Sequence, residues 1–373
     1  MNLIAPLQDR WRDLRNRLLA SPGFQDFAVR FPLTRPISRK RSKDLFDLLA
    51  GFAYSQVLYA SVRLNLFDML RNGALAIPEI ARRIGWPADK TERLLKAAAA
   101  IGLVEQASGG SYGLGIHGAA LLGNPWIARF IEHHHLLYAD LADPLALLRG
   151  DVARPALQGY WAYAGSDAPE AAAPEATHAY TQLMAASQMG VAKEVLAAYD
   201  FSPHRHLMDV GGSNGTFLTQ VAAKHRQLGL TLFDLPGVVA HARDSQAVRA
   251  LGSRIALESG SFLSDPLPRG ADIVTLVRIL HDHDDESVLK LLGAIRSALP
   301  PEGVLLVAEP LSGEPATAAV TDAYFNLYFA AMGQGRTRSV AEIGRLGRAA
   351  GFAQIRAIRT RMPLITGLAV LSN

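Results

Sequence analysis

Three polar clusters follow short apolar runs in the second half of this 373-residue chain. The first is a Gly-rich turn, Asp209-Val210-Gly211-Gly212-Ser213-Asn214-Gly215. Such a turn between a strand and a helix presents backbone N–H groups at a helix N-terminus, where anionic or strongly polar parts of a ligand bind. The other two clusters are Phe233-Asp234-Leu235-Pro236 and His281-Asp282-His283-Asp284-Asp285. Polar clusters at successive ends of parallel strands predict one crevice for cofactor and substrate along that edge of the sheet.

The glycine spacing distinguishes between nucleotide cofactors. Glycines stand at 211, 212 and 215, so Ser213 occupies a position that G-x-G-x-x-G needs for glycine, and no GK[ST] ending of a triphosphate loop follows. Asp234 lies 25 residues after Asp209, about where an acid binds a ribose diol. A ribose site without a pyrophosphate signature points to S-adenosylmethionine. The predicted cofactor-binding residues at these two strand ends are Asp209, Gly211, Gly212, Gly215 and Asp234.

Composition narrows the class of protein. Hydrophobic residues make up 49% and charged residues 19%, as in a packed globular protein. The absence of cysteine excludes disulfides, thiolate metal sites and thiol nucleophiles, and fits a reducing compartment. We find no uninterrupted apolar stretch of about 18 residues and no signal-peptide pattern. The expectation is a soluble, cytoplasmic protein without a membrane-spanning helix.

Residues 1–43 form a basic arm. Ten Lys or Arg and three Asp give it a charge of +7, which leaves −3 for the rest of a chain whose net charge is +4. Ile4, Leu7, Trp11, Leu14 and Leu18 recur at helical spacing beside the basic residues. Such a helix suits the anionic surface of a membrane, here the inner membrane. Alternatively, it packs on a partner subunit or on its own domain and leaves its charges in water.

Two domains are expected after the arm. Residues 44–163 begin with a helix over 43–70 that is apolar on more than one face, and is therefore a core helix or a subunit interface. Helices at 77–85 and 91–101, then a hairpin at 102–105 and 111–114, form a winged-helix pattern. An Ala/Pro/Gly/acid linker follows at 164–176. Within 177–373, strands near 207–209, 231–233, 254–257, 273–277 and 304–307 alternate with helices, which predicts a parallel sheet covered by helices.

The chain resembles the small-molecule O-methyltransferases with a winged-helix-like dimerisation domain. The resemblance covers residues 45–373 and rests on the motifs at 209–212, 233–236, 280–282, 307–309 and 350–352. It implies an α/β, Rossmann-like class I methyltransferase domain preceded by an all-α winged-helix-like dimerisation domain, with S-adenosylmethionine as cofactor, in a homodimer. Segments 31–36, 50–56 and 281–285 further resemble purple-bacterial carotenoid hydroxyl methylases of the hydroxyneurosporene and demethylspheroidene type. This narrower resemblance implies a lipophilic substrate, methylated on the tertiary 1-hydroxyl of an acyclic carotenoid.

The resemblance also implies roles for individual residues. His281 opens the H-D motif and corresponds to the family's general base, and Glu309 matches an acid that orients it. Thr337 stands where the family has a second orienting Glu. Ser261 occupies the place of an adenine-binding Asp, and His283 that of an adenine-stacking Trp. Ser261, Phe262, Arg278 and Asp282 complete the predicted cofactor-binding set, although Asp282 could instead cap the following helix.

The proton transfer at His281 has to accompany methyl transfer. An alcohol with a pKa near that of water, about 15.7, facing a histidine near 6.5 is mismatched by about nine units, or roughly 12 kcal/mol. Prior ionisation is therefore excluded on magnitude. General-base assistance of this kind contributes about 10²- to 10⁴-fold to the rate.

Other interpretations remain open. The substrate could be a phenol, polyketide or tetrapyrrole. A winged helix with a basic arm could be a DNA-binding regulator. In the candidate recognition helix over 89–96, however, two acids partly offset three bases, and Leu94 and Leu95 need burial, so we expect no binding to nucleic acid. A nicotinamide-dependent oxidoreductase is a weaker alternative.

Histidines 133–135 point in different directions on a helix and predict no metal site. Several aromatic-rich positions could line a polyene channel or be ordinary core, which we favour for most of them: Trp126, Phe130, His134, Tyr138, Tyr160, Trp161, Tyr163 and Met184.

Overall fold

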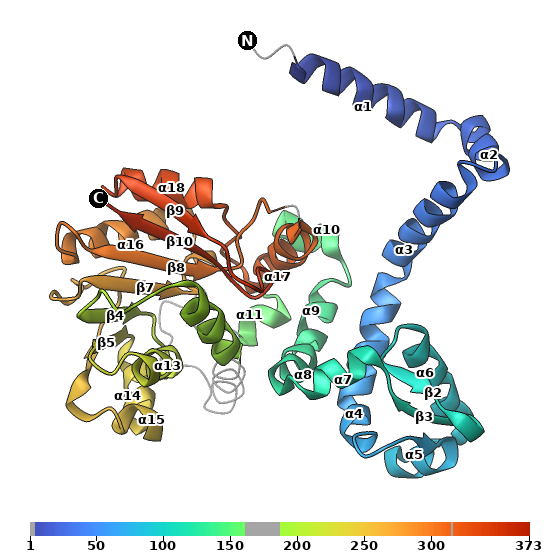
Figure 1. The fold of residues 1–373 in the computed structure, drawn as a ribbon, viewed down its shortest axis with the longest axis horizontal. Helices are drawn as coiled ribbons and strands as arrows, with labels where there is room; N and C mark the ends of the chain where they lie inside the picture. The colour runs from blue at the N-terminus through green and yellow to red at the C-terminus, as the bar shows by residue number, and fades with distance from the viewer. Residues whose placement is uncertain (1–3, 161–186, 315) are drawn as a thin grey trace. The chain divides into compact units, whose positions relative to one another are not determined.

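A computed structural model describes residues 4–160, 187–314 and 316–373, which form two compact units, Met1–Gly123 and Asn124–Asn373 (Figure 1). The linker expected at 164–176 lies outside the described residues, as do Trp161, Tyr163 and Met184. Residues 124–160, grouped above with the first domain, belong to the second compact unit. The reason is packing: Leu137, Leu147 and Leu157 share a buried cluster with residues of helix α17 (Phe325–Met332).

The first unit begins with three helices, α1 (Ile4–Ala20), α2 (Pro22–Arg30) and α3 (Arg35–Arg63). Proline stands in the first turn of α2 and of α3, where its missing N–H costs no helical hydrogen bond. The helix predicted for 43–70 is interrupted at Asn65, whose φ of 52° separates α3 from α4 (Leu66–Met69). Burial is slight: no residue of α2 is buried, and in α3 only Ser61 and Val62 are.

Helix α3 corrects one expectation. By length and composition it could cross a membrane, because an 18-residue window reaches a mean hydropathy of 1.3 although a few polar residues interrupt it. Only 11% of this window is buried within the chain, so α3 is not a core helix of its own subunit. A helix whose apolar side packs on another protein has the same composition. Large apolar residues are exposed over 45–52: Leu45, Phe46, Leu48, Leu49 and Phe52.

The rest of the first unit confirms the winged-helix pattern. Helices α5 (Ile77–Ile84), α6 (Ala88–Ala100) and α7 (Ile116–Leu122) accompany the hairpin of β2 (Val104–Gln106) and β3 (Ser111–Leu114), joined by a turn at Ser108–Gly110. An additional strand, β1 (Leu75–Ala76), pairs antiparallel with β3. The unit is thus helical with a small sheet, in the order β1-β3-β2, and not wholly α.

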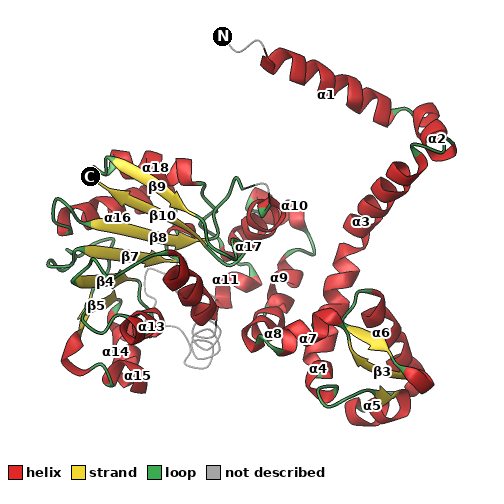
Figure 2. Cartoon of the chain, in the orientation of Figure 1, coloured by secondary structure: helices red, strands yellow, loops and turns green. Residues whose placement is uncertain are grey.

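A seven-stranded sheet in the order β6-β5-β4-β7-β8-β10-β9 forms the centre of the second unit (Figure 2). The five predicted strands are present and parallel to one another: β4 (His206–Val210), β5 (Gly229–Asp234), β6 (Ile255–Ser259), β7 (Ile273–Val277) and β8 (Val304–Glu309). Two strands were not predicted, β9 (Gln354–Ile358) and β10 (Gly367–Ser372). β10 pairs antiparallel with both β8 and β9.

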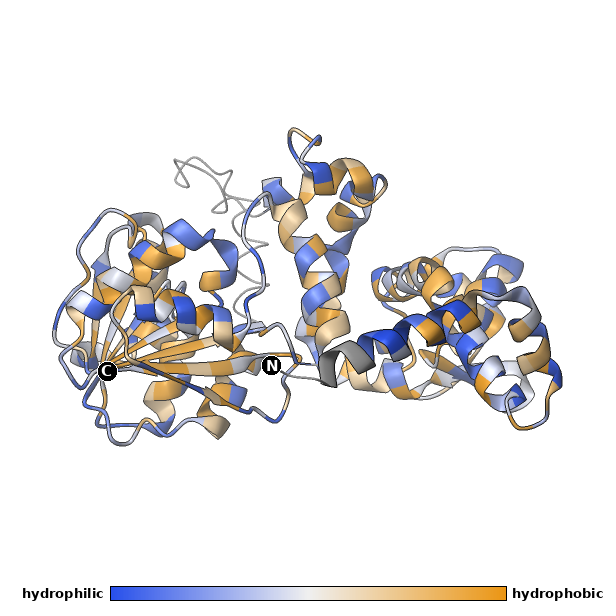
Figure 3. Cartoon of the chain, turned by 90° about the horizontal axis from the view of Figure 1, so that it is seen from above, coloured by the Kyte–Doolittle hydropathy of each residue, from blue (hydrophilic) through white to orange (hydrophobic). Residues whose placement is uncertain are grey.

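The core lies on both faces of this sheet, in two clusters of buried residues. Figure 3 shows the hydrophobic colour along its strands. Because side chains alternate along a strand, Leu207 joins one cluster and Met208 the other. The first cluster includes α13 (Thr216–Lys224), α14 (Pro236–Asp244) and a helix over 187–198. The second includes α16 (Asp285–Ala298) and α18 (Val340–Ala349).

Successive strands extend outward from β4 on one side and from β7 on the other, so the order reverses between these two neighbours. In open α/β sheets a ligand crevice forms at the carboxyl ends of the strands at such a point. A short 3-10 turn, Leu280–Asp282, follows β7, and a π-helix, Ala319–Tyr324, leads directly into α17. The remaining helical elements are α8 (Pro125–Glu132), α9 (His134–Asp140), α10 (Pro144–Arg149), α11 (Ala156–Tyr160), α15 (Gln246–Arg249) and a turn at Gly252–Arg254.

Candidate active site

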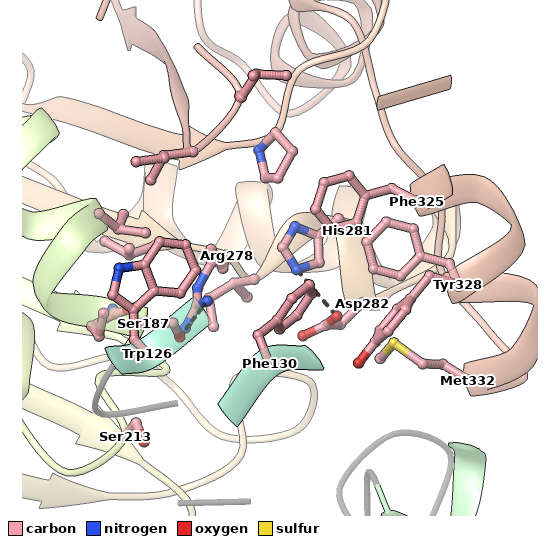
Figure 4. Close-up of a pocket in the computed structure, with 18 of the residues that line it drawn as sticks. Trp126, Phe130, Ser187, Ser213, Arg278, His281, Asp282, Phe325, Tyr328 and Met332 are labelled. Carbon is pink, nitrogen blue, oxygen red and sulfur yellow. Dashed lines mark hydrogen bonds and ion pairs between the residues drawn. The ribbon is translucent and has the colours of Figure 1, made fainter. Parts of the chain in front are cut away.

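A cavity of about 310 Å³ opens at this reversal point (Figure 4). Four of the predicted site residues line it, Gly211 after β4 and Arg278, His281 and Asp282 after β7. The structure places the other predicted residues behind this surface or farther along the same sheet edge. They are Asp209, Gly212, Gly215, Asp234, Ser261, Phe262 and Glu309.

The glycine turn has no room for side chains. Gly211 and Gly215 have φ values of 73° and 78°, which L-residues rarely adopt. An added Cβ at Gly211 would lie 2.3 Å from the side chain of Ile279, and one at Gly215 would lie 2.6 Å from Val248. The turn therefore lets the backbone after β4 approach the loop after β7 closely.

Asp209 lies next to this turn in the interior. Its Oδ1 accepts a hydrogen bond from Thr275 Oγ1 at 2.6 Å, whereas its buried Oδ2 has no partner within the described residues. Burial raises the pKa of Asp209 to about 7. A buried acceptor without a partner beside exposed turn N–H groups fits the amine and carboxylate of an amino-acid moiety, as S-adenosylmethionine carries.

Asp234 ties the ends of β4 and β5 together. Its Oδ2 accepts from the main-chain N–H of Ser213 at 2.8 Å, and its Oδ1 accepts from that of Leu235 at 2.7 Å. Burial raises its pKa to about 6, although these two hydrogen bonds favour the ionised form. A carboxylate has further acceptor positions, so the predicted ribose contact is compatible with this geometry.

Ser261 and Phe262 follow directly at the same sheet edge. The N–H of Gly260 donates to the carbonyl of Asp234 at 2.9 Å, which brings the two strand ends together. The N–H of Ser261 donates to Asp265 at 2.7 Å. Phe262 makes an edge-to-face contact with His283 at 5.3 Å between ring centroids. His283, expected in place of a stacking Trp, is thus an aromatic neighbour of Phe262.

Arg278 occupies an unusual backbone position after β7. Its φ of 59° is left-handed, and its N–H donates to the carbonyl of Ala308 at 2.9 Å. Its guanidinium donates to Ser187 Oγ at 3.0 Å, from the helix over 187–198 (Figure 4). Arg278 therefore brings a cation to the cofactor side of the cavity, where its positive charge also contributes to lowering the pKa of His281.

His281 is buried, with 10% of its side chain exposed, between two carboxylates. Its Nε2 lies 3.3 Å from Asp282 Oδ1, and its Nδ1 lies 3.7 Å from Glu309 Oε2. Its ring stacks on Phe329 at 4.9 Å and 25°. Burial, and then the nearby cation of Arg278, lowers its pKa well below the usual value. A neutral imidazole at the cavity surface can accept a proton from a bound hydroxyl.

Glu309 holds the loop that carries His281. Its Oε1 accepts from the main-chain N–H groups of Ile279 and Leu280, and at 3.3 Å from that of His281. Only 1% of its side chain is exposed, and burial, followed by the charge of Asp282, raises its pKa to about 8. Glu309 thus fixes the position of the histidine backbone through three hydrogen bonds.

The loop between α17 and α18 also supports this turn. Arg338, fully buried, donates to the carbonyls of Leu280 and His283 and to Asp285. The N–H of Arg336 donates to the carbonyl of His281 at 2.9 Å. An added Cβ at Gly335 would lie 2.1 Å from that carbonyl oxygen, so glycine is required there.

Two expectations about neighbouring residues are resolved. Asp282 does not cap the following helix, because Asp284 is the N-cap of α16 and accepts from the N–H of Ser287 at 2.8 Å. Thr337 does not replace the second acid that would orient His281. Its hydroxyl donates to Asn326 Oδ1 at 3.0 Å.

The sequence analysis did not predict the aromatic residues that line the cavity together with the loop that carries His281, here called the aromatic wall. Helix α17 and the preceding π-helix contribute Tyr324, Phe325, Tyr328 and Phe329 to the cavity. The i, i+4 spacing of these two aromatic pairs was the available signal. Of the aromatic residues considered for a channel, Trp126 and Phe130 on α8 line the cavity, and His134, Tyr138 and Tyr160 do not.

Two of the consecutive histidines hold this wall in place. His133 Nε2 lies 2.6 Å from the hydroxyl of Tyr328, and His134 Nε2 lies 2.8 Å from that of Tyr324. His134 Nδ1 donates to the carbonyl of Phe130, which can only accept, so His134 Nε2 accepts a hydrogen bond from the hydroxyl of Tyr324. Burial lowers the pKa of His133 to about 3. The histidines therefore act as neutral hydrogen-bonding partners of the tyrosines.

Comparisons with known proteins agree with this site. Residues 46–123 match the O-methyltransferase dimerisation domain, and residues 138–353 match the O-methyltransferase domain. The chain is 42% identical to the demethylspheroidene O-methyltransferase of Cereibacter sphaeroides over 91% of this chain and 89% of that one. It is 39% identical to the enzyme of the same name from Rhodobacter capsulatus over 98% and 90%.

One solved structure is similar over most of this chain. CalO1, a methyltransferase of calicheamicin biosynthesis in its SAH-bound form, is 27% identical and aligns with a TM-score of 0.74 over 89% of this chain and 98% of its own. Two domain matches in the expected order, together with a buried histidine at the switch point of the sheet, lead to one assignment. The chain belongs to the O-methyltransferase family that joins a dimerisation domain to a methyltransferase domain.

Proposed function

We propose that this enzyme transfers a methyl group from S-adenosylmethionine to the tertiary 1-hydroxyl of an acyclic carotenoid of the hydroxyneurosporene or demethylspheroidene type. The observation that carries the proposal is a neutral histidine in a cavity whose polar residues, such as Ser213 and Arg278, follow the strand ends and whose other lining is largely aromatic and aliphatic. Such a cavity accepts a substrate whose single polar group is the one that reacts. The two relatives named as demethylspheroidene O-methyltransferases support this choice over a phenol, polyketide or tetrapyrrole.

The size of the cavity indicates how a long substrate binds. About 310 Å³ is at the small end of ligand pockets, which span roughly 300–1,000 Å³. The bound cofactor would fill part of it, so the cavity admits the hydroxyl-bearing end of a long polyene and leaves the remainder outside. Phe325, Tyr328 and Phe130 offer flat, apolar ring surfaces for that end (Figure 4).

The residues of this chain divide the chemistry between them. S-adenosylmethionine supplies a methyl group on a positively charged sulfur when it is bound. The turn at Gly211, together with Asp209, Asp234 and Arg278, would hold it at the carboxyl ends of β4, β5 and β7. His281 Nε2 accepts the proton of the substrate hydroxyl as that oxygen is alkylated. The aromatic wall excludes water, which would otherwise compete for the methyl group.

Transfer of labelled methyl from S-adenosylmethionine to detergent-solubilised 1-hydroxy carotenoids tests the proposal. Wild-type protein should label the carotenoid, and His281→Ala should lose most of this activity, about 10²- to 10⁴-fold. His135→Ala is the matched control, because His135 is exposed on the surface. Cofactor binding without transfer to any hydroxy carotenoid would contradict the substrate assignment.

The match to the dimerisation domain supports a homodimer. The exposed apolar residues of α3 lie partly within the matched range and are the surface that a second subunit is expected to cover. Sedimentation equilibrium of wild-type protein and of Leu48→Glu checks this. A dimer that the substitution leaves intact would place the interface elsewhere.

We further propose that the basic arm brings the enzyme to the cytoplasmic face of the inner membrane, where a carotenoid would be dissolved. Trp11, Leu14 and Leu18 on α1 are exposed, at 67%, 51% and 44%, beside basic residues, a combination suited to an anionic lipid surface. The arm also precedes both matched domains. Flotation with phosphatidylglycerol vesicles should recover the wild-type enzyme, and Trp11→Ser together with Leu14→Ser should abolish recovery. Equal recovery with neutral phosphatidylcholine vesicles would refute the electrostatic part.

A further inference from the structure

Two carboxylates, and not one, bracket the histidine base. Asp282 Oδ1 and Glu309 Oε2 are at ion-pair distances of 3.3 and 3.7 Å from opposite nitrogens of His281. Among the described residues no other acid reaches this ring, and Thr337 is occupied by Asn326. We propose that Asp282 is the second acid of the proton transfer, a positioning residue that orients His281 and stabilises its protonated form. This inference rests on the proposed transfer to a hydroxyl.

The two acids are not equivalent. One oxygen of Glu309 is saturated by three main-chain N–H groups, and its side chain is 1% exposed, so it is a fixed anchor. Asp282 lines the cavity, with 28% of its side chain exposed, and its one ion-pair partner among the described residues is His281 (Figure 4). It is also free of the helix-capping role, which Asp284 fulfils. Asp282 is therefore the acid that faces both the base and the bound substrate.

The proton has a defined route in this arrangement. An Nδ1–H directed at Glu309 leaves the lone pair of Nε2 facing the cavity and Asp282. The substrate oxygen forms its bond to the methyl carbon while the carbon–sulfur bond breaks and leaves its electron pair on sulfur. The hydroxyl proton moves to Nε2. The resulting imidazolium then lies between two carboxylates, and its Nε2–H can form a charge-assisted hydrogen bond with Asp282.

The electrostatics of the surroundings make this contribution necessary. Arg278 and Arg338 are cations, and His283 becomes one when protonated; all three disfavour a positive charge on His281, as does burial. Asp282 and Glu309 are the groups that oppose them. Because Asp282 and His281 are in contact, they share protons, and burial raises the pKa of Asp282 to about 7. Because burial lowers the pKa of His281 well below its usual value, activity should rise with pH along an acid limb below about pH 6.5, as the base loses its proton.

Asp282→Asn separates this role from cofactor binding. Removal of the carboxylate lowers the pKa of His281, so the acid limb of kcat/KM should move to lower pH by about one unit or more. The maximal kcat should fall roughly 10- to 100-fold, as for the loss of one hydrogen bond to a charged group. Asp282→Glu should restore part of the activity. Asp284→Asn is the control, because it removes a neighbouring charge and retains a good N-cap.

Two measurements keep the outcomes distinct. Titration calorimetry with S-adenosylmethionine should give a dissociation constant within about threefold of wild type for Asp282→Asn. An unmoved acid limb with greatly weakened cofactor binding would overturn the proposal and leave a cofactor role. NMR titration of the ring nitrogens in ¹⁵N-histidine protein, with His281→Gln to assign the signal, needs no acceptor substrate. If the wild-type enzyme methylates no carotenoid, the proposed substrate is wrong. The NMR titration of His281 in wild type and in Asp282→Asn still tests whether Asp282 stabilises the protonated histidine. Identical titrations in wild type and Asp282→Asn would refute it.

Discussion

Replacing the buried Arg338 would test whether the catalytic turn is held in place from outside the cavity. Its guanidinium donates to the carbonyls of Leu280 and His283 and to the carboxylate of Asp285. In Arg338→Ala the carbonyl of Leu280 keeps the main-chain N–H of His283 at 3.3 Å, whereas the carbonyl of His283 loses the donor from Arg338. One unpaired buried acceptor costs about 1–3 kcal/mol. The side chain of Asp285 is 50% exposed and keeps its ion pair with Arg336, so the loss of the ion pair between Arg338 and Asp285 adds little to the destabilisation. The expected destabilisation is roughly 1–3 kcal/mol.

Urea unfolding followed by circular dichroism measures this change, and kcat measures its effect on the turn. Because the carbonyl of Leu280 directly precedes His281, kcat should fall by at least about tenfold, the equivalent of about 1.4 kcal/mol. Arg345→Ala is the control. Its side chain is 69% exposed and 3.9 Å from Glu342, so the free energy of unfolding should change by less than about 0.5 kcal/mol. Unfolding of Arg338→Ala at the same urea concentration as this control would show that the turn does not depend on the arginine.

Further predictions concern local contacts. Phe329→Leu removes the ring that stacks on His281; aromatic pairs contribute about 0.5–1.5 kcal/mol, so kcat should fall about 2- to 13-fold while calorimetry shows unchanged cofactor binding. Gly293→Ala fills open space inside α16 and should stabilise the protein by about 0.5–1 kcal/mol, and a lower melting temperature would contradict this. Burial would raise the pKa of Glu342, but hydrogen bonds from Ser339 and Arg336 lower it to about 2. This carboxylate therefore stabilises the fold above its unfolded pKa of about 4.3, and the advantage of wild type over Glu342→Gln in urea should disappear as the pH falls toward 2.

Much of the methyltransferase fold could be predicted because its signals are local. Apolar runs that end in polar turns located the five parallel strands, and glycines with positive φ marked the cofactor turn. The two antiparallel strands at the end of the chain were missed. β9 is exposed along most of its length, and β10 is a short apolar run, a pattern that fits a buried helix as well as a strand.

The histidine base, its acid on β8 and the polar strand ends were all predicted to lie together, and the structure brings them to one sheet edge. The aromatic wall was not predicted, because Tyr328 meets His133 across 195 residues of sequence. The i, i+4 spacing of the aromatic residues predicts that they share a helix face, but how α17 packs decides which residues that face contacts.

The sequence by itself determined which chemical groups stand at each strand end, since backbone hydrogen bonding and turn geometry depend on residues a few positions apart. Only the tertiary structure decided how those groups divide the work. It showed that Asp284 caps the helix and leaves Asp282 beside His281, that Thr337 turns to Asn326, and that Arg338 holds the turn from the interior. Each of these depends on distances between segments far apart in the chain, and those distances are fixed by close packing of the two faces of the sheet.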